Sequence, residues 1–182
     1  MKPLIFLPFL LVLASCGGLG GLEVFTTVTD FELTSQQGTT VHLKDLKGKV
    51  WIADTFFTTC TGPCPMMSAR MRVIGRQLES YPDIRLVSFS VDPEHDTPAA
   101  LAEYAHKFQA RADRWIFLTG TLEALNRVCA DGLDLTLVTG DQSHSTRFAL
   151  VDRAARVRGY YNSSDSDAMK RLVADAKTLV VQ

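Results

Sequence analysis

The spacing of the apolar positions changes along the chain, and these changes predict strands alternating with helices. Apolar or β-branched residues run almost continuously through 50–57 and 84–91, as they do in buried strands. Elsewhere they recur every three to four positions, as on the buried face of a helix. The predicted strands cover 50–57, 84–91, 115–118, 147–152 and 156–161, and the predicted helices follow residues 65, 97, 121 and 163.

Two helix starts carry capping signals. Thr97-Pro98 reads as an N-cap followed by a first-turn proline. Ser164 with Asp167 three residues later resembles a capping box. Both signals support helices at these places in the chain.

A hairpin and a cysteine-bearing loop define the expected fold. Gln37-Gly38 lies between two short β-rich segments, 31–33 and 40–43, and predicts a turn between paired strands. Strands alternating with helices indicate an α/β sheet. The strand at 50–57 ends in a loop with two cysteines that opens a helix, the layout of a thioredoxin-like fold. We therefore expect an α/β, thioredoxin-like fold: a central mixed sheet flanked by helices, with an N-terminal β-hairpin.

The first fifteen residues have the pattern of a secretory signal peptide. Lys2 precedes the apolar run 4–13, which is shorter than the roughly 20 residues that a bilayer-spanning helix needs. Leu13-Ala14-Ser15-Cys16 then resembles the bacterial lipoprotein box, in which the cysteine becomes the lipidated first residue. The other interpretation is an ordinary signal peptide beside an unrelated cysteine.

A glycine-rich stretch follows Cys16 and predicts a tether. The expected organisation is a lipoprotein signal peptide at 1–15, a tether at 16–23 and a single domain at 24–182. Such a chain would be an extracytoplasmic, membrane-anchored lipoprotein of the bacterial cell envelope, facing the periplasm or the outer side. Disulfides can persist in that environment.

Composition and charge narrow the classes of function. The 182 residues carry a formal net charge of −1, without the basic excess that nucleic-acid binding requires, so no nucleic-acid partner is expected. Four cysteines are too few for a disulfide scaffold of this length. Cys129 lies on an apolar helical stripe and is expected to be a buried, inert thiol.

Cys60 and Cys64 are the candidate reactive pair. They are separated by three residues at the predicted start of a helix, where unpaired backbone N–H groups and the helix dipole favour thiolates. Thiolates are soft ligands that suit Cu(I). The pair could bind one ion, exchange disulfides or form a structural disulfide. Dithiol oxidoreductases normally have two intervening residues, so the third weakens the redox interpretation without excluding it.

Four motifs follow one another over roughly residues 25–180: FTTCTGPCP at 57–65, SVDPEHDTP at 90–98, LTG at 118–120 and DQSHS at 141–145. With these motifs in this order, the chain resembles the Sco/SenC family of copper-binding, thioredoxin-like proteins. The resemblance implies that Cys60, Cys64 and His144 bind copper, as Cu(I), Cu(II) or both.

The same resemblance implies a function and partners. The protein would deliver copper to the dicopper centre of cytochrome c oxidase, or keep that centre's cysteines reduced. Its partners would be the copper-bearing oxidase subunit or another copper acceptor, a copper donor protein, and the membrane through a lipid anchor.

His144 has independent support from the distribution of prolines. None of the seven prolines follows Pro98, so the proline that a thioredoxin-type oxidoreductase places before the strand facing its cysteines is missing. Ser143-His144-Ser145 occupies that place. Two thiolates and one imidazole are one ligand short of a closed zinc site and suit three-coordinate Cu(I), or Cu(II) with an added water or carboxylate.

Two other activities compete with the role of a copper-delivering metallochaperone. An extracytoplasmic thiol–disulfide reductase acting on oxidase cysteines or other exported proteins needs only Cys60 and Cys64, and both roles can coexist. A peroxiredoxin is disfavoured because Ala53 and Phe57 occupy its proline and hydroxyl positions. Asp92 is a candidate second-sphere contact of the metal or part of a docking surface.

Overall fold

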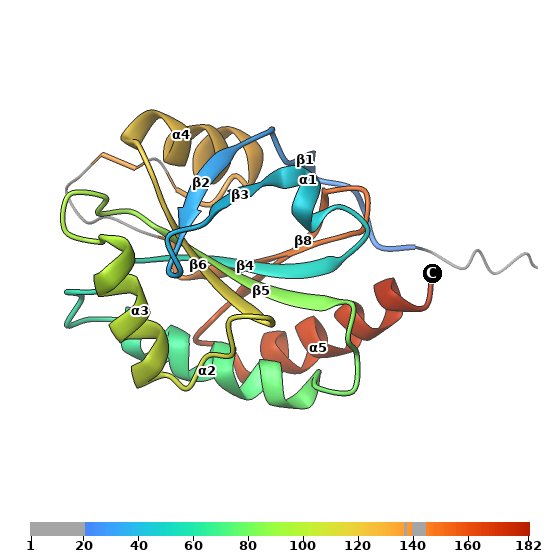
Figure 1. Ribbon diagram of the computed structural model, residues 1–182. Coiled ribbons are helices and arrows are strands. Elements are labelled where there is room, and N and C mark those ends of the chain that lie inside the picture. The colour runs from blue at the N-terminus through green and yellow to red at the C-terminus, as the bar shows by residue number, and fades with distance from the viewer. Residues whose placement is uncertain (1–20, 137, 140–144) are drawn as a thin grey trace, which may run out of the picture.

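The computed structural model describes residues 21–136, 138–139 and 145–182, and a mixed β-sheet runs through their centre (Figure 1). The strands, in the sheet order β1-β8-β7-β4-β5-β6-β2-β3, form an eight-stranded sheet within these residues. The strands are β1 (Thr26–Thr27), β2 (Glu32–Ser35), β3 (Thr40–His42), β4 (Val50–Phe56), β5 (Ile84–Ser90), β6 (Trp115–Thr119), β7 (Arg147–Val151) and β8 (Arg156–Asn162). The helices are α1 (Leu43–Leu46), α2 (Cys64–Gln77), α3 (Pro98–Lys107), α4 (Leu122–Asn126) and α5 (Ser166–Val180), with a π-helical segment η1 (Arg127–Gly132) after α4.

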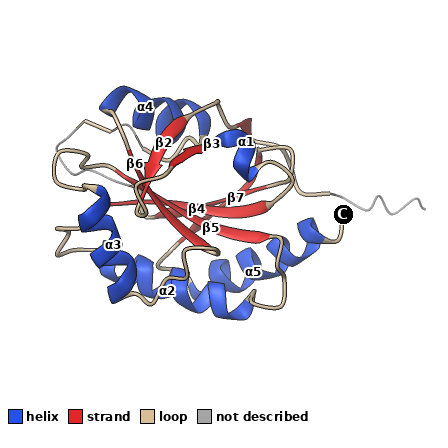
Figure 2. Ribbon diagram, in the orientation of Figure 1, coloured by secondary structure: helices blue, strands red, loops and turns tan. Residues whose placement is uncertain are grey.

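The sheet is parallel at its centre and antiparallel toward both edges. β4 pairs with β5, and β5 with β6, in parallel. β7 and β8 extend the sheet antiparallel on one side, and the β2–β3 hairpin extends it on the other. Helices cover both faces: α2, α3 and α5 lie below the sheet, and α1 and α4 above it (Figures 1 and 2). The expected α/β architecture, including the N-terminal hairpin, is confirmed.

The core is built around β4, in which every residue is buried. Large side chains from several strands fill the space between the layers, since a continuous apolar strand must be covered on both faces. The largest fully buried ones include Trp51, Phe56, Phe89, Phe117 and Phe148. A single carboxylate, Asp54, interrupts this apolar strand at full burial.

The local signals for turns and helix starts are largely confirmed. Gly38 has φ 73°, a left-handed conformation that suits glycine at the hairpin turn. Thr97 caps α3 by accepting a hydrogen bond from the N–H of Ala100. The capping box at Ser164 is wrong by one position, because Asp165 is the N-cap of α5 and accepts from the N–H groups of Asp167 and Ala168.

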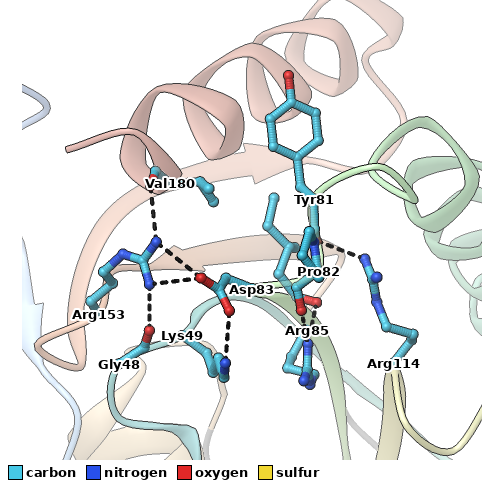
Figure 3. Close-up of polar contacts among 10 residues, drawn as sticks. Gly48, Lys49, Tyr81, Pro82, Asp83, Arg85, Arg114, Arg153 and Val180 are labelled. Carbon is cyan, nitrogen blue, oxygen red and sulfur yellow. Dashed lines mark hydrogen bonds and ion pairs between the residues drawn. The ribbon is translucent and has the colours of Figure 1, made fainter.

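The ends of the parallel strands opposite the cysteine loop are joined by arginine contacts (Figure 3). Arg153 donates to the carbonyls of Gly48 and Val180 at 2.6 and 2.9 Å. Asp83 lies between Lys49 and Arg153, at 2.7 and 3.4 Å from their nitrogens. These contacts attach the last helix and the β7–β8 turn to the start of β4.

Leu22 and Glu23, near the start of the described residues, contact the domain. The Leu22 side chain packs on the core, and the guanidinium of Arg158 donates to the Leu22 and Glu23 carbonyls. The leader, Cys16 and most of the predicted tether lie outside the described residues. Among the helices that are described, none has the length and hydropathy of a membrane span.

Candidate metal centre

Cys60 and Cys64 lie where the central strand passes into a helix. β4 ends at Phe56, and the Cys60 N–H donates to the Phe57 carbonyl at 3.3 Å, which folds the chain back on itself. Cys64 is the first residue of α2, with Pro63 before it as N-cap. Neither cysteine forms a disulfide with a described residue; Cys60 is half-buried and Cys64 fully buried. The expected position of the pair at the start of a helix is confirmed.

The two thiols interact directly, and their environment keeps Cys64 protonated. Burial raises the pKa of the Cys64 thiol, and a hydrogen bond to Cys60 raises it further, against a smaller lowering by the Phe57 backbone. For this residue the expectation that the helix start favours a thiolate is wrong, because loss of hydration outweighs the helix dipole. A soft cation would have to displace the proton from Cys64 to bind there.

A buried carboxylate holds the start of the cysteine loop against β5. Asp96 accepts hydrogen bonds from the Thr58 N–H at 3.0 Å, from the Thr58 hydroxyl at 2.5 Å and from the Ser90 hydroxyl at 2.6 Å. Burial raises the pKa of Asp96, and these three hydrogen bonds oppose the shift. Asp96 therefore positions the backbone two residues before Cys60. Sequence reasoning missed this residue, because its partner Thr58 lies 38 positions away.

Asp92 and His95 form an ion pair beside the Asp96 contacts. The Nδ1 atom of His95 lies 2.8 and 3.0 Å from the two Asp92 carboxylate oxygens. The Asp92 carboxylate raises the pKa of His95 through this hydrogen bond and its charge. Asp92 is buried and His95 is exposed, so the pair runs from the interior to the surface of the 90–98 segment.

Two polar groups lie in the core near the cysteine pair. Burial raises the pKa of Asp54 to about 7, and the Ser88 hydroxyl opposes this shift. Neither Asp54 oxygen makes a well-formed hydrogen bond to a described residue. The Tyr104 hydroxyl is paired with the Ser68 hydroxyl at 3.0 Å. Burial is the main cause of the raised pKa values of Cys64 and Tyr104, and the charges of Asp54 and Cys60 add to both shifts, so these groups share one electrostatic environment.

Three sequence-based expectations have different outcomes. His144 and Cys16 lie outside the described residues, so their assignments stay predictions. Cys129 is fully buried in η1, which confirms its expected burial, and burial raises its pKa. Across the part of the chain that the structure describes, no group of three or more His, Cys, Asp or Glu side chains is arranged to hold a metal. The described site therefore comprises two of the three expected ligands.

A thioredoxin-like domain with a thiol pair at the mouth of a helix defines a class of proteins that bind soft metals or exchange disulfides. Comparison with known proteins narrows the class. The family model described as SCO1/SenC matches residues 21–180. The chain belongs to the SCO1/SenC family.

Individual relatives are similar to this chain, in sequence or in structure, over most of its length. The SCO1 protein homolog of Bacillus subtilis is 33% identical over 175 residues, which cover 92% of this chain and 91% of the relative. The structure of BsSco, described as a Sco-family cytochrome c oxidase assembly protein with a disulfide switch, matches with a TM-score of 0.78 and 31% identity, covering 88% of this chain and 97% of that one. Copper-bound ScoI of Arabidopsis thaliana matches with a TM-score of 0.71 and 25% identity, covering 84% of this chain and 99% of that one.

Proposed function

We propose that this protein binds copper through Cys60, Cys64 and His144 and delivers it to, or matures, the dicopper centre of cytochrome c oxidase. The observation that carries the proposal is the Cys60–Cys64 thiol pair, hydrogen-bonded together where β4 passes into α2. The copper-bound ScoI relative and the oxidase-assembly role described for BsSco support it.

The chemistry of the two thiols fits copper as a cargo. Soft sulfur donors favour Cu(I), and a half-exposed Cys60 gives a partner's thiolates access to the ion. Because Cys64 is held as a thiol, binding should release protons. In transfer, an acceptor's thiolates would attack the ion and His144, the weaker ligand for Cu(I), would leave first. The ion would then never be free in solution.

The same proposal includes a location. Cys16 would carry a lipid that holds the domain at the membrane of a bacterial cell envelope, on its extracytoplasmic side. The lipobox-like residues 13–16 and the glycine-rich stretch after them support this arrangement. Mass spectrometry of the membrane fraction, with Cys16→Ala as control, tests it: the wild-type chain should begin at a diacylated Cys16. A soluble wild-type chain without lipid would refute the anchor.

Anaerobic titration of the fully reduced protein with Cu(I) tests the copper site. We expect one Cu(I) per chain, proton release on binding, and loss or strong weakening in Cys60→Ser. Cys129→Ser is the matched control, because Cys129 is a buried thiol away from the pair, and it should bind as wild type does. No copper binding by reduced wild type, or equal binding by Cys60→Ser, would refute the proposal.

His144→Ala separates copper delivery from thiol–disulfide exchange. The contact between Cys60 and Cys64 also supports thiol–disulfide exchange, since two thiols this close can form a disulfide. Copper delivery predicts altered absorption and spin-resonance spectra in His144→Ala and slower transfer to a thiolate acceptor. Exchange needs only the two cysteines, so a disulfide reductase predicts unchanged reduction of a disulfide substrate by this variant. Copper transfer at the wild-type rate would refute the role of His144.

A further inference from the structure

A pocket at the end of the domain opposite the cysteines is lined by arginines. Its volume is about 230 Å³, and it lies between the second half of α2, the start of β5 and the turn after α3. The pocket is lined by four arginines, Arg72, Arg76, Arg111 and Arg114, and its apolar lining includes Leu86 and Trp115.

The pocket is separate from the candidate metal centre. Ile84, at the start of β5, pairs with the start of β4, whereas Ser90 pairs with Phe56 just before the cysteine loop. Six residues of strand correspond to roughly 20 Å. The helix agrees, since the twelve positions from Cys64 to Arg76 on α2 rise by roughly 18 Å. In Figure 1, α2 leads from the cysteine loop on the left toward the C-terminal end on the right.

Two of the arginines lack an anionic partner. Arg72 and Arg76 both donate to one neutral acceptor, the Oε1 atom of Gln109, at 3.3 Å each. Within the described ranges no ion pair forms at either guanidinium, and the Nε–H of Arg72 is buried without a hydrogen-bond acceptor. Buried N–H groups normally have an acceptor, so this donor is available to a bound anion.

The other two arginines are held at the rim. Arg114 donates to the carbonyls of Leu78 and Tyr81 at 3.0 and 2.9 Å, the second of which Figure 3 shows. Burial and the charge of Arg85 lower the pKa of Arg114, as expected where cations are crowded. Arg111 pairs with Glu79 and Asp113 at largely exposed positions. The pocket is therefore a preformed cationic site with more arginines than carboxylates.

We propose that this pocket binds the phosphate group of a small phosphate ester. Planar guanidinium groups donate in pairs to phosphate oxygens, and Arg72 and Arg76 have donors to spare. The pocket is smaller than the roughly 300–1,000 Å³ of sites for whole drug-sized ligands, so it suits a headgroup-sized anion. The apolar side chains of Leu86 and Trp115 would contact the ester substituent. The source of the phosphate is either a phospholipid headgroup or a soluble phosphate ester, and the proposal does not depend on copper binding.

Calorimetric titration of the full chain with inorganic phosphate and with glycerol phosphate tests the site. We expect saturable binding that Arg72→Gln/Arg76→Gln weakens at least about tenfold, since each charged hydrogen bond is worth that much or more. The matched control is Arg127→Gln/Arg171→Gln, which removes the same charge from exposed arginines on η1 and α5. This control should bind as wild type does.

Vesicle flotation distinguishes the two sources. To exclude the proposed lipid on Cys16, every chain compared carries Cys16→Ala. A lipid headgroup predicts that this full chain binds vesicles containing phosphatidylglycerol more than pure phosphatidylcholine vesicles, that glycerol phosphate competes, and that only the added Arg72/Arg76 changes abolish the binding. No binding to either vesicle, with phosphate binding intact, identifies a soluble ester. The absence of phosphate binding by wild type, or equal weakening in both double variants, would overturn the proposal.

Discussion

Asp54 and Asp83 are carboxylates toward opposite ends of the same parallel strands, and their surroundings affect them in opposite ways. Asp54 is fully buried near the cysteine end, and burial raises its pKa to about 7. Asp83 is partly exposed at the opposite end, which carries Arg153 and the arginine-lined pocket and is called the arginine end below. Its hydrogen bond and ion pair with Lys49 lower its pKa, and Arg153 lowers it further. The cysteine end thus holds a buried carboxyl group at a cost in stability, whereas Asp83 at the other end is paired with cations in reach of water.

The largest expected effect is that of Asp54→Asn on the pH dependence of stability. The pKa of Asp54 rises from 3.8 to about 7 on folding, so wild type loses stability as pH rises between these values and no further above them. The loss amounts to about 4 kcal/mol at most. Urea unfolding at pH 5 and pH 8 measures the part of this loss that falls above pH 5, about 3 kcal/mol.

An asparagine side chain is uncharged at every pH, so Asp54→Asn does not lose stability between pH 5 and pH 8 through this position. The stability of Asp54→Asn relative to wild type should therefore increase from pH 5 to pH 8. Parallel pH profiles for the two proteins would contradict the raised pKa, whatever the fixed cost of the buried amide.

The second effect is that of Asp96→Ala on the cysteine loop. Removing the carboxylate leaves the Thr58 and Ser90 donors without their acceptor. We expect a loss of about 2–4 kcal/mol in unfolding free energy, together with faster reaction of Cys60 with a thiol reagent. Asp113→Ala, at an exposed carboxylate of the arginine end, is the control and should change neither quantity much. Unchanged thiol reactivity in Asp96→Ala would show that Asp96 does not position the loop.

A smaller effect is expected for Ser68→Ala, which removes the partner of the buried Tyr104 hydroxyl. Leaving that hydroxyl unpaired should cost about 1–2 kcal/mol. Replacing both partners should cost less than the sum of the single changes, because Ser68→Ala/Tyr104→Phe leaves no polar group unsatisfied. Thermal unfolding of the two single variants and the double variant measures the coupling, and strict additivity would argue against the pair.

Local patterns predict much of this molecule because local physics decides those features. The buried run at 50–57, the turn at Gln37-Gly38 and the Thr97 cap depend on residues close in sequence, and each was found where expected. The cysteine pair was equally predictable, since both residues belong to one loop and helix start.

Contacts between distant segments could not be predicted. The Asp96–Thr58 hydrogen bonds span 38 residues, and nothing in the short acidic segment around Asp96 indicates its partner. Arg153 joins three separate segments, and none of these contacts is visible in the local sequence around it. The raised pKa of Cys64 is also a tertiary effect, because its burial comes from the whole core rather than from the helix start.

The smallest effect is expected for Asp83→Asn, and its salt dependence sharpens the comparison between the two ends. Because the pKa of Asp83 is lowered on folding, its contribution is present above 3.8 and is lost as pH falls through the lowered value. Arg153 keeps its bonds to the Gly48 and Val180 carbonyls in the variant, so the loss at neutral pH should be modest. Urea unfolding at low and high sodium chloride should show this loss shrinking with salt, since exposed ion pairs are screened. The effect of Asp54→Asn should not shrink with salt, because the Asp54 carboxylate is buried away from solvent. Equal salt dependence of the two variants would mean that the two ends do not differ as described.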